Sequence, residues 1–156
     1  MARRRRAVKR KVTPDSKYGD VTVSRLVSKV MMKGKKTLAQ RIVYDALEYA
    51  NKQTKREPVQ VLMDAVKNAS PLLRVKPRRV GGATYQVPVE VEPDTGSALA
   101  IRWIISSARA REGEPMSIRL AKEIVEASRG QGVAVKRRED THKMAEANRA
   151  FVHYRW

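Results

Sequence analysis

The sequence of 156 residues contains no cysteine, only two histidines and only one phenylalanine. Without thiols there is no disulfide, no thiolate nucleophile and no cysteine-ligated zinc. The two histidines, His142 and His153, lie far apart without metal-ligand spacing, so neither a metal nor a cofactor is expected. Long apolar runs are absent too, and none follows the basic N-terminus. We therefore expect no membrane span and no signal peptide.

Acidic residues are also scarce. The 34 Lys and Arg stand against 16 Asp and Glu, which gives a formal net charge of +18 and a pI near 10.7. Repulsion on this scale destabilises a compact chain unless a polyanion neutralises it. Nucleic acid is the leading candidate partner, and an anionic membrane surface is the other. The hydrophobic content of 42% and the chain length are those of one domain with a buried core.

Apolar residues recur at helical spacing in six segments. In the first, Asp20 serves as the N-cap, and the residues on one apolar face are Val23, Leu26, Val27, Val30 and Met31. Prolines at helix starts and glycines at helix ends mark several boundaries. The first three predicted helices cover about residues 20–34, 37–51 and 58–71. The fourth begins near residue 95, the fifth runs from 115 to about 130, and the sixth runs from about 134 to 149.

Four expectations concern how these helices bury their side chains. The periodicity assigns Leu38 to the apolar face of the second helix and Met63 to that of the third. Trp103 lies in a nearly all-apolar helix and is expected in the core. The last helix is short of apolar residues, and we expect it to lie partly free of the body.

The stretch RVKPRRVGGATYQVPVEV, residues 74–91, predicts a β-hairpin. Tyr85, Val87 and Val89 alternate with polar residues, and Gly81-Gly82 permits a tight turn because glycine reaches positive φ. A lone two-stranded ribbon is marginal in water, so it must lie against another surface. The predicted fold is mainly α: a bundle of about six helices with an extended two-stranded β-hairpin arm inserted between helices three and four, plus a basic N-terminal tail.

Basic residues concentrate in the tail, along the first helix and the turn that follows it, and in the arm. No acid occurs in residues 21–44 or 66–88. Lysine and arginine bind phosphates, Tyr85 can stack on a base, and Gly81-Gly82 lets the tip approach a nucleic-acid backbone. The predicted binding residues are Arg3, Arg4, Arg5, Arg6, Lys9, Arg10, Lys11, Arg25, Lys29, Lys33, Lys35, Lys36, Arg41, Arg74, Lys76, Arg78, Arg79, Gly81, Gly82 and Tyr85.

The body is asymmetric and carries a single arm, a single basic stripe and a single tail. This arrangement favours a target of irregular shape, and folded RNA is irregular whereas duplex DNA is regular. An architectural double-stranded DNA-binding protein with a basic β-arm is the alternative. We interpret the chain as a single RNA-binding domain over 1–156. Its parts are the basic tail 1–19, helices one to three over 20–71, the arm over 72–91, helices four and five over 95–130, and helix six with an aromatic tail over 134–156.

No catalytic motif is complete. The stretch KGKKT around Gly34 has Lys29 where a phosphate-binding loop needs its first glycine. The stretch GQGVAV has Val135 where a dinucleotide fingerprint has its third glycine. We therefore expect neither an enzyme nor a small-molecule substrate.

Three stretches resemble a known family: DVTVSRLVSKVMMKGKKTLAQRIVYDA over 20–46, RRVGGATYQVPVEV over 78–91 and MAEANRAFVHYRW over 144–156. In the first, the acidic start, the Gly34-Lys35-Lys36 turn and the Ile42-Val43 pair match. The sequence is thereby similar to the seventh protein of the small ribosomal subunit in its bacterial form. Val152 stands where that family has a smaller residue.

The resemblance implies a helical body with a β-arm that binds early and directly to the 3′ major domain of small-subunit ribosomal RNA and organises the head. It implies a cytoplasmic, ribosomal location at the subunit interface, near the exit-site tRNA and the mRNA path. Ribosomal proteins nine and eleven would be its neighbours. The face toward the tRNA or a neighbouring protein would comprise Lys136, Arg137, Arg138, Lys143, Arg149, Tyr154 and Trp156.

Overall fold

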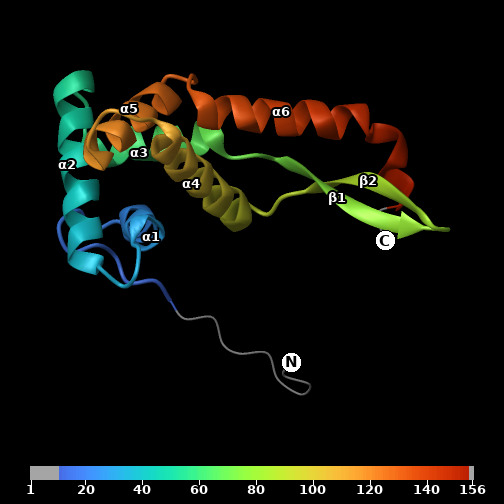
Figure 1. The fold of residues 1–156 in the computed structure, drawn as a ribbon, viewed down its shortest axis with the longest axis horizontal. Helices are drawn as coiled ribbons and strands as arrows, with labels where there is room; N and C mark the ends of the chain where they lie inside the picture. Colours follow the sequence, from blue (N-terminus) through green and yellow to red (C-terminus); the bar gives the residue numbers. More distant parts are fainter. Residues whose placement is uncertain (1–10, 155–156) are drawn as a thin grey trace, which may run out of the picture.

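The computed structural model describes residues 11–154, and within them the chain is mainly helical (Figure 1). A single antiparallel hairpin interrupts the helices between α3 and α4, as the sequence predicted. The elements are α1 (Val21–Val30), α2 (Lys36–Thr54), α3 (Pro58–Ala69), β1 (Leu73–Val80), β2 (Ala83–Glu90), α4 (Pro93–Ala110), α5 (Met116–Ser128), α6 (Val133–Ala147) and a short 3-10 helix, η1 (Arg149–Tyr154).

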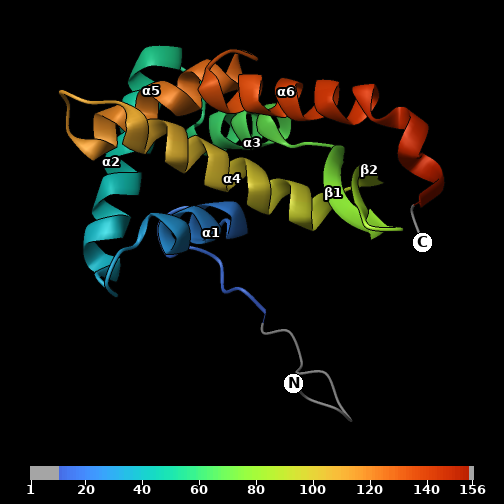
Figure 2. The same cartoon turned by 45° about the vertical axis from the view of Figure 1, so that its right-hand side comes forward.

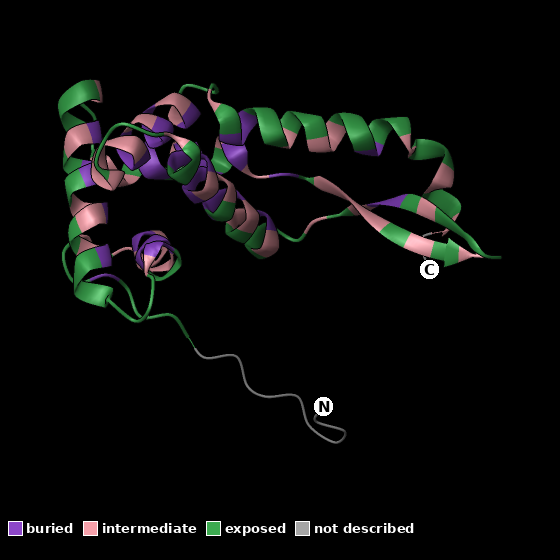
Figure 3. Cartoon of the chain, in the orientation of Figure 1, coloured by how far each residue is buried: buried purple, intermediate pink, exposed green. Residues whose placement is uncertain are grey.

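The core lies among α1 to α5, which we call the body. Helix α5 packs against α2, α3 and α4, and α1 closes the far side against α2 and α4. Leucines and isoleucines from these helices are fully buried between them, among them Leu47, Leu62, Ile104 and Leu120. Burial is concentrated here, whereas most of α6 and the hairpin is exposed or half-buried (Figure 3). The body therefore holds most of the hydrophobic stabilisation.

Three side chains expected in the core lie at its edge. Leu38 is 48% exposed and Met63 is 41% exposed. Each is adjacent in sequence to a buried residue, Ala39 and Leu62, and one step along a helix turns a side chain by about 100° away from the buried stripe. Trp103 is only partly buried against the core. The prediction was wrong for Leu38 and Met63, whereas Trp103 does pack against the core without being fully buried.

The first helix begins as predicted and ends earlier. The Asp20 carboxylate accepts hydrogen bonds from the backbone N–H of Thr22 at 2.6 Å and of Val23 at 3.1 Å, so it is the N-cap. The helix ends at Val30 rather than near residue 34, because Met31 takes an extended conformation with a φ of −55° and a ψ of 133°. Lys33 and Gly34, with left-handed φ values of 52° and 75°, then form the turn that leads into α2.

The chain is anchored to the body from Asp15 onward, within the stretch predicted as tail. Asp15 is buried and accepts hydrogen bonds from the backbone N–H of Lys17 and Tyr18. The Tyr44 hydroxyl on α2 donates to the same carboxylate at 2.9 Å. Tyr18 and Tyr44 also meet edge to face, with ring centroids 5.7 Å apart. These contacts fix the entry of the chain beside α2.

The hairpin, residues 73–90, has the predicted turn. Its strands pair from Leu73↔Glu90 to Val80↔Ala83, and Gly81 and Gly82 take φ values of 57° and 89°. These angles favour glycine, which has no Cβ to clash. We call this hairpin the arm.

Helix α6 leaves the body and runs along the arm, and η1 turns back onto β2 (Figure 2). The first turn of α6 is buried through Ala134 and Val135, and Ala145 is buried further along. The expected departure from the body is therefore present, and α6 covers one side of the arm. This contact supplies part of the surface that an isolated ribbon lacks.

Candidate nucleic-acid interface

A run of exposed cations follows the edge formed by α1, the turn after it and the start of α2. Within residues 11–154 no carboxylate lies within ion-pair distance of any of them. Arg25, also on α1 and also predicted to bind, differs from these cations because its guanidinium lies 3.5 Å from the Asp94 carboxylate. We call this set the α1–α2 edge; its unpaired members are Lys29, Lys33, Lys35, Lys36 and Arg41.

The N-terminus of α2 has an unfavourable charge for a helix start. Lys35 is the N-cap residue without a side-chain capping bond, Lys36 is the first helical residue, and the first turn holds no acid. The helix dipole and the free N–H groups of the first turn favour negative charge there, so lysines oppose helix stability. A bound anion such as a phosphate would offset this loss of helix stability, because it would neutralise the lysines and accept hydrogen bonds from the free N–H groups.

The cations of the arm divide between its two faces. Arg74, Lys76 and Arg78 pair across the ladder with Val89, Val87 and Tyr85, and directly paired side chains share a face. All three cations on this face are half-buried.

Arg79 lies on the opposite face of the arm and is exposed, as are its neighbours Thr84 and Gln86. The sequence prediction treated the basic residues of β1 as one surface. The register separates Arg79 from the other three.

Tyr85 is already in contact with aromatic rings of the chain itself. Its ring centroid lies 5.1 Å from that of Phe151 and 5.1 Å from that of Tyr154, and the Tyr154 ring is nearly parallel at 28°. Offset aromatic pairs of this kind are favourable beyond the area they bury. The sequence predicts that Tyr85 stacks on a base and that Tyr154 faces a neighbouring molecule. In the structure both rings instead contact each other, because the aromatic residues of η1 face the arm.

Two of the four predicted cations on α6 bind the body. The Arg138 guanidinium donates to the Asn68 carbonyl at 2.6 Å, and the Arg137 guanidinium lies 5.9 Å from the Trp103 ring centroid. Lys136 and Lys143 are exposed, as is Arg149 at the start of η1. For these three residues, contact with a partner stays a prediction.

A buried acid that the sequence analysis missed fixes the start of α6. Glu123 on α5 is 0% exposed and accepts a hydrogen bond from the Ala134 N–H at 3.0 Å. Its other oxygen accepts from Arg111 at 2.7 Å, and Arg111 also contacts Glu126. The hydrogen bond to Glu126 raises the pKa of Arg111 most, and the hydrogen bond to Glu123 raises it further. The signal for this residue was its position, because Glu123 falls at helical spacing on the face that also carries Leu120 and Ile124.

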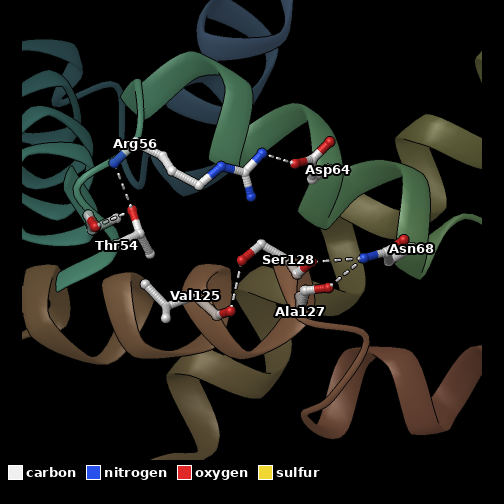
Figure 4. A network of polar contacts seen from close by, with 8 residues as sticks. Thr54, Arg56, Asp64, Asn68, Val125, Ala127 and Ser128 are labelled. Carbon is white, nitrogen blue, oxygen red and sulfur yellow. Dashed lines mark hydrogen bonds and ion pairs between the residues drawn. The ribbon is translucent and has the colours of Figure 1, made fainter.

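Helices α3 and α5 are joined by a second polar contact. The Asn68 side-chain amide donates to the carbonyls of Ala127 at 2.9 Å and Ser128 at 3.0 Å, as Figure 4 shows. Because Arg138 of α6 binds the Asn68 carbonyl, this one residue connects three helices. The orientation of α6, and with it the support of the arm, therefore depends on polar contacts with the body.

Part of the predicted set lies outside the described residues: Arg3, Arg4, Arg5, Arg6, Lys9, Arg10 and Trp156. Lys11 is described and exposed. Across residues 11–154 no cluster of three or more His, Asp or Glu side chains is placed to hold a metal ion. Over the same span no helix combines the length and apolarity that crossing a bilayer requires.

The fold and the charge distribution define a basic, mainly α-helical protein whose β-arm and helical edge are suited to a polyanion. The family model described as ribosomal protein S7p/S5e matches residues 2–149. The chain belongs to this family, and the resemblance stated from the three sequence stretches is confirmed.

Similar proteins extend over the same length. The small ribosomal subunit protein uS7 of Dehalococcoides mccartyi is 59% identical over 156 residues, covering all of both chains. That of Thermotoga petrophila is 57% identical over 154 residues, covering 99% of each chain. That of Rhizorhabdus wittichii is 58% identical over 156 residues, again covering both chains fully. The chain is thus a structural protein of the small ribosomal subunit, located in cytoplasmic ribosomes, and not an enzyme.

Proposed function

We propose that this protein binds directly to the 3′ major domain of small-subunit ribosomal RNA and nucleates assembly of the head. The α1–α2 edge is the observation that carries the proposal. Its five cations are exposed and have no acidic partner within residues 11–154. An RNA backbone presents negative charges to such a surface and would remove the repulsion among them. The arm, through Arg79 and the glycine turn, would extend the contact.

We further propose that the protein lies at the subunit interface, near the exit-site tRNA and the mRNA path, with ribosomal proteins nine and eleven as neighbours. The outer side of α6 supports a second partner, because Lys136 and Lys143 are exposed there. Arg149 extends this side toward the arm.

The mechanism is assembly by charge neutralisation and shape recognition, without a chemical step. Each phosphate that is neutralised contributes roughly 0.7 to 0.9 to the slope of log affinity against log salt. If six to ten cations engage phosphates, affinity falls about a thousandfold or more between roughly 50 and 200 mM salt. An affinity that ignores salt would contradict this mechanism.

The test is a competition assay at physiological salt. Labelled 3′ major domain RNA bound to the full chain is challenged with excess duplex DNA and, separately, with unrelated structured RNA. We expect the complex to resist both competitors, because the arm and the helical edge must fit one irregular shape together. Equal displacement by either competitor would reduce the interaction to nonspecific attraction by a chain of charge +18.

A further inference from the structure

The C-terminal 3-10 helix η1 lies against the arm and contacts the face that carries Tyr85 (Figure 2). The Tyr154 ring stacks on the Tyr85 ring with the two planes 28° apart, and the Phe151 ring meets Tyr85 at an angle of 48°. A nucleobase that stacks on a tyrosine offers the same kind of nearly parallel aromatic plane. Tyr154 therefore fills, within the chain itself, a position on Tyr85 that suits a base.

The same face of the arm carries cations that lack an acidic partner. Arg74 and Lys76 share the face of Tyr85, because the strand register pairs them with residues of that face. Neither has a carboxylate within ion-pair distance among residues 11–154. Within the same residues, the Nε of Arg74 is buried without a hydrogen-bond partner. A buried donor without an acceptor costs free energy, so this face is suited to an anion that the chain does not supply.

The attachment of η1 to the arm is slight. The helix has six residues, none of them is buried, and Phe151 and Tyr154 are only half-buried. Runs of 3-10 helix longer than three or four residues are uncommon, because their hydrogen bonds have poor geometry. Segments with few buried contacts open at a low cost in free energy. Helix η1 can therefore leave the arm while the body stays folded.

We infer that η1 is a displaceable cover on the arm, which RNA replaces when it binds the Tyr85 face. In the free chain, η1 keeps the Tyr85 ring out of water. In the complex, an RNA base takes the place of the Tyr154 ring, and η1 moves away from β2. The ring contacts must be broken before RNA binds, so the cover weakens binding to the arm. This inference rests on the proposed function and adds to it a step in which the arm is uncovered.

The first measurement uses Phe151 as a probe of the cover. The sequence has one phenylalanine, so labelling the full chain with 4-fluorophenylalanine gives a single fluorine resonance. The labelled Tyr85→Ala variant shows where this resonance lies when the ring has lost its partner on the arm. When the 3′ major domain RNA binds, we expect the resonance of the otherwise unmodified chain to move toward that reference. A resonance that stays in place in the complex overturns the inference, because η1 would still lie on the arm.

The second measurement is the affinity of the double variant Phe151→Ala with Tyr154→Ala, which removes both rings from the cover. Because these ring contacts no longer have to be broken, the variant should bind the same RNA about tenfold more tightly. The matched control, Met144→Ala with Val152→Ala, removes two exposed apolar side chains from the same part of the chain and should bind like the unmodified protein. Circular dichroism verifies that each variant is folded.

The two possible failures are distinguishable. Weaker or unchanged binding of the ring variant overturns the inference, because η1 would then support the arm in the complex instead of covering it. Failure of the unmodified chain to bind this RNA specifically is a different result, which overturns the proposed function itself.

Discussion

The body and the arm are stabilised in different ways. In the body, five helices enclose a continuous set of fully buried apolar side chains such as Leu47, Leu62 and Ile104. In the arm, only Val87 and Pro88 are buried, and the remaining contacts come from α6 and the aromatic rings of η1. The body is thus held by hydrophobic burial, whereas the arm is held by a covering helix, ring contacts and its own ladder.

This difference explains how each region tolerates repulsion among its exposed cations. The body tolerates the exposed α1–α2 edge because its core contributes stability that repulsion among surface charges does not cancel. The arm has no such reserve, so its cations depend on α6, η1 and a bound polyanion. Local stability follows buried contacts, and segments with few of them open more readily. Substitutions in either region should therefore act on that region alone.

The largest effect is expected where α6 joins the body. Glu123→Ala removes the acceptor for the Ala134 N–H and one of the two acidic partners of Arg111. Breaking a buried ion pair and leaving a buried N–H unpaired lowers the free energy of unfolding by about 3 kcal/mol. Urea unfolding monitored by circular dichroism measures this loss.

The control for Glu123 is Glu114→Ala. Glu114 also pairs with a cation, Lys122 at 2.6 Å, but both side chains are more than one third exposed. An exposed pair contributes about 0.5 kcal/mol or less. Equal losses in the two variants would mean that the buried acid does not fix α6.

A smaller effect is expected from Phe151→Ala, which removes one of the two rings against Tyr85. The pair contributes about 1 kcal/mol, so the amides of β2 should exchange several times faster with deuterium. Amides of the body should exchange at their original rates. Val152→Ala, a truncation of an exposed neighbour, should change the arm less. Faster exchange throughout the body would contradict the separation of the two regions.

Lys36 and Lys52 provide a matched test on one helix, because both are exposed and lie at opposite ends of α2. Lys36→Gln should lower the salt slope of RNA binding by about 0.7 to 0.9, the loss of one phosphate contact. The same variant should be folded at least as stably, since it removes a positive charge from a helix N-terminus. Lys52→Gln should leave the slope unchanged. If Lys52→Gln changed the salt slope and Lys36→Gln did not, the RNA would contact the C-terminal end of α2 instead of its N-terminus.

The smallest effect is a pH dependence at the base of the arm. The Leu72 N–H donates to Nε2 of His142 at 3.0 Å, and burial, together with the nearby Arg138 charge, lowers the pKa of His142. The native state therefore binds fewer protons than the unfolded chain just below the ordinary value of 6.5, and stability falls as the pH drops through this range.

The expected loss for His142 is below about 1 kcal/mol between roughly pH 7 and pH 5, because the group is only partly buried. Amide exchange near residue 72, measured at both pH values, would reveal it. His142→Gln should remove this pH dependence, and His153→Gln at an exposed position should leave it in place. A pH response that survives in His142→Gln would assign it to another group.

Local patterns in the sequence predicted the elements well. The six helices, the Asp20 cap and the glycine turn all follow from spacing and from residue preferences that act within a few positions. The early end of α1 was not predicted, because Met31 leaves the helical conformation although it continues the helical spacing of apolar residues.

Contacts between residues far apart in the sequence could not be predicted from the periodicity of apolar residues. The contact of Tyr85 with Phe151 joins residues 66 positions apart in the chain. The capping of α6 by Glu123 likewise depends on how two helices meet. The sequence therefore predicted which residues are basic and exposed along the α1–α2 edge. It could not predict which cations, such as Arg138, already have a partner within the fold.

Hydrogen–deuterium exchange on the full chain, free and bound to the 3′ major domain RNA, tests the central comparison most directly. We expect amides of the body to exchange slowly in both states. Amides of the arm and of the turn after α1 should exchange faster in the free chain and become protected by the RNA. Equal protection of the arm with and without RNA would contradict the account, because the arm would then need no partner to be held in place.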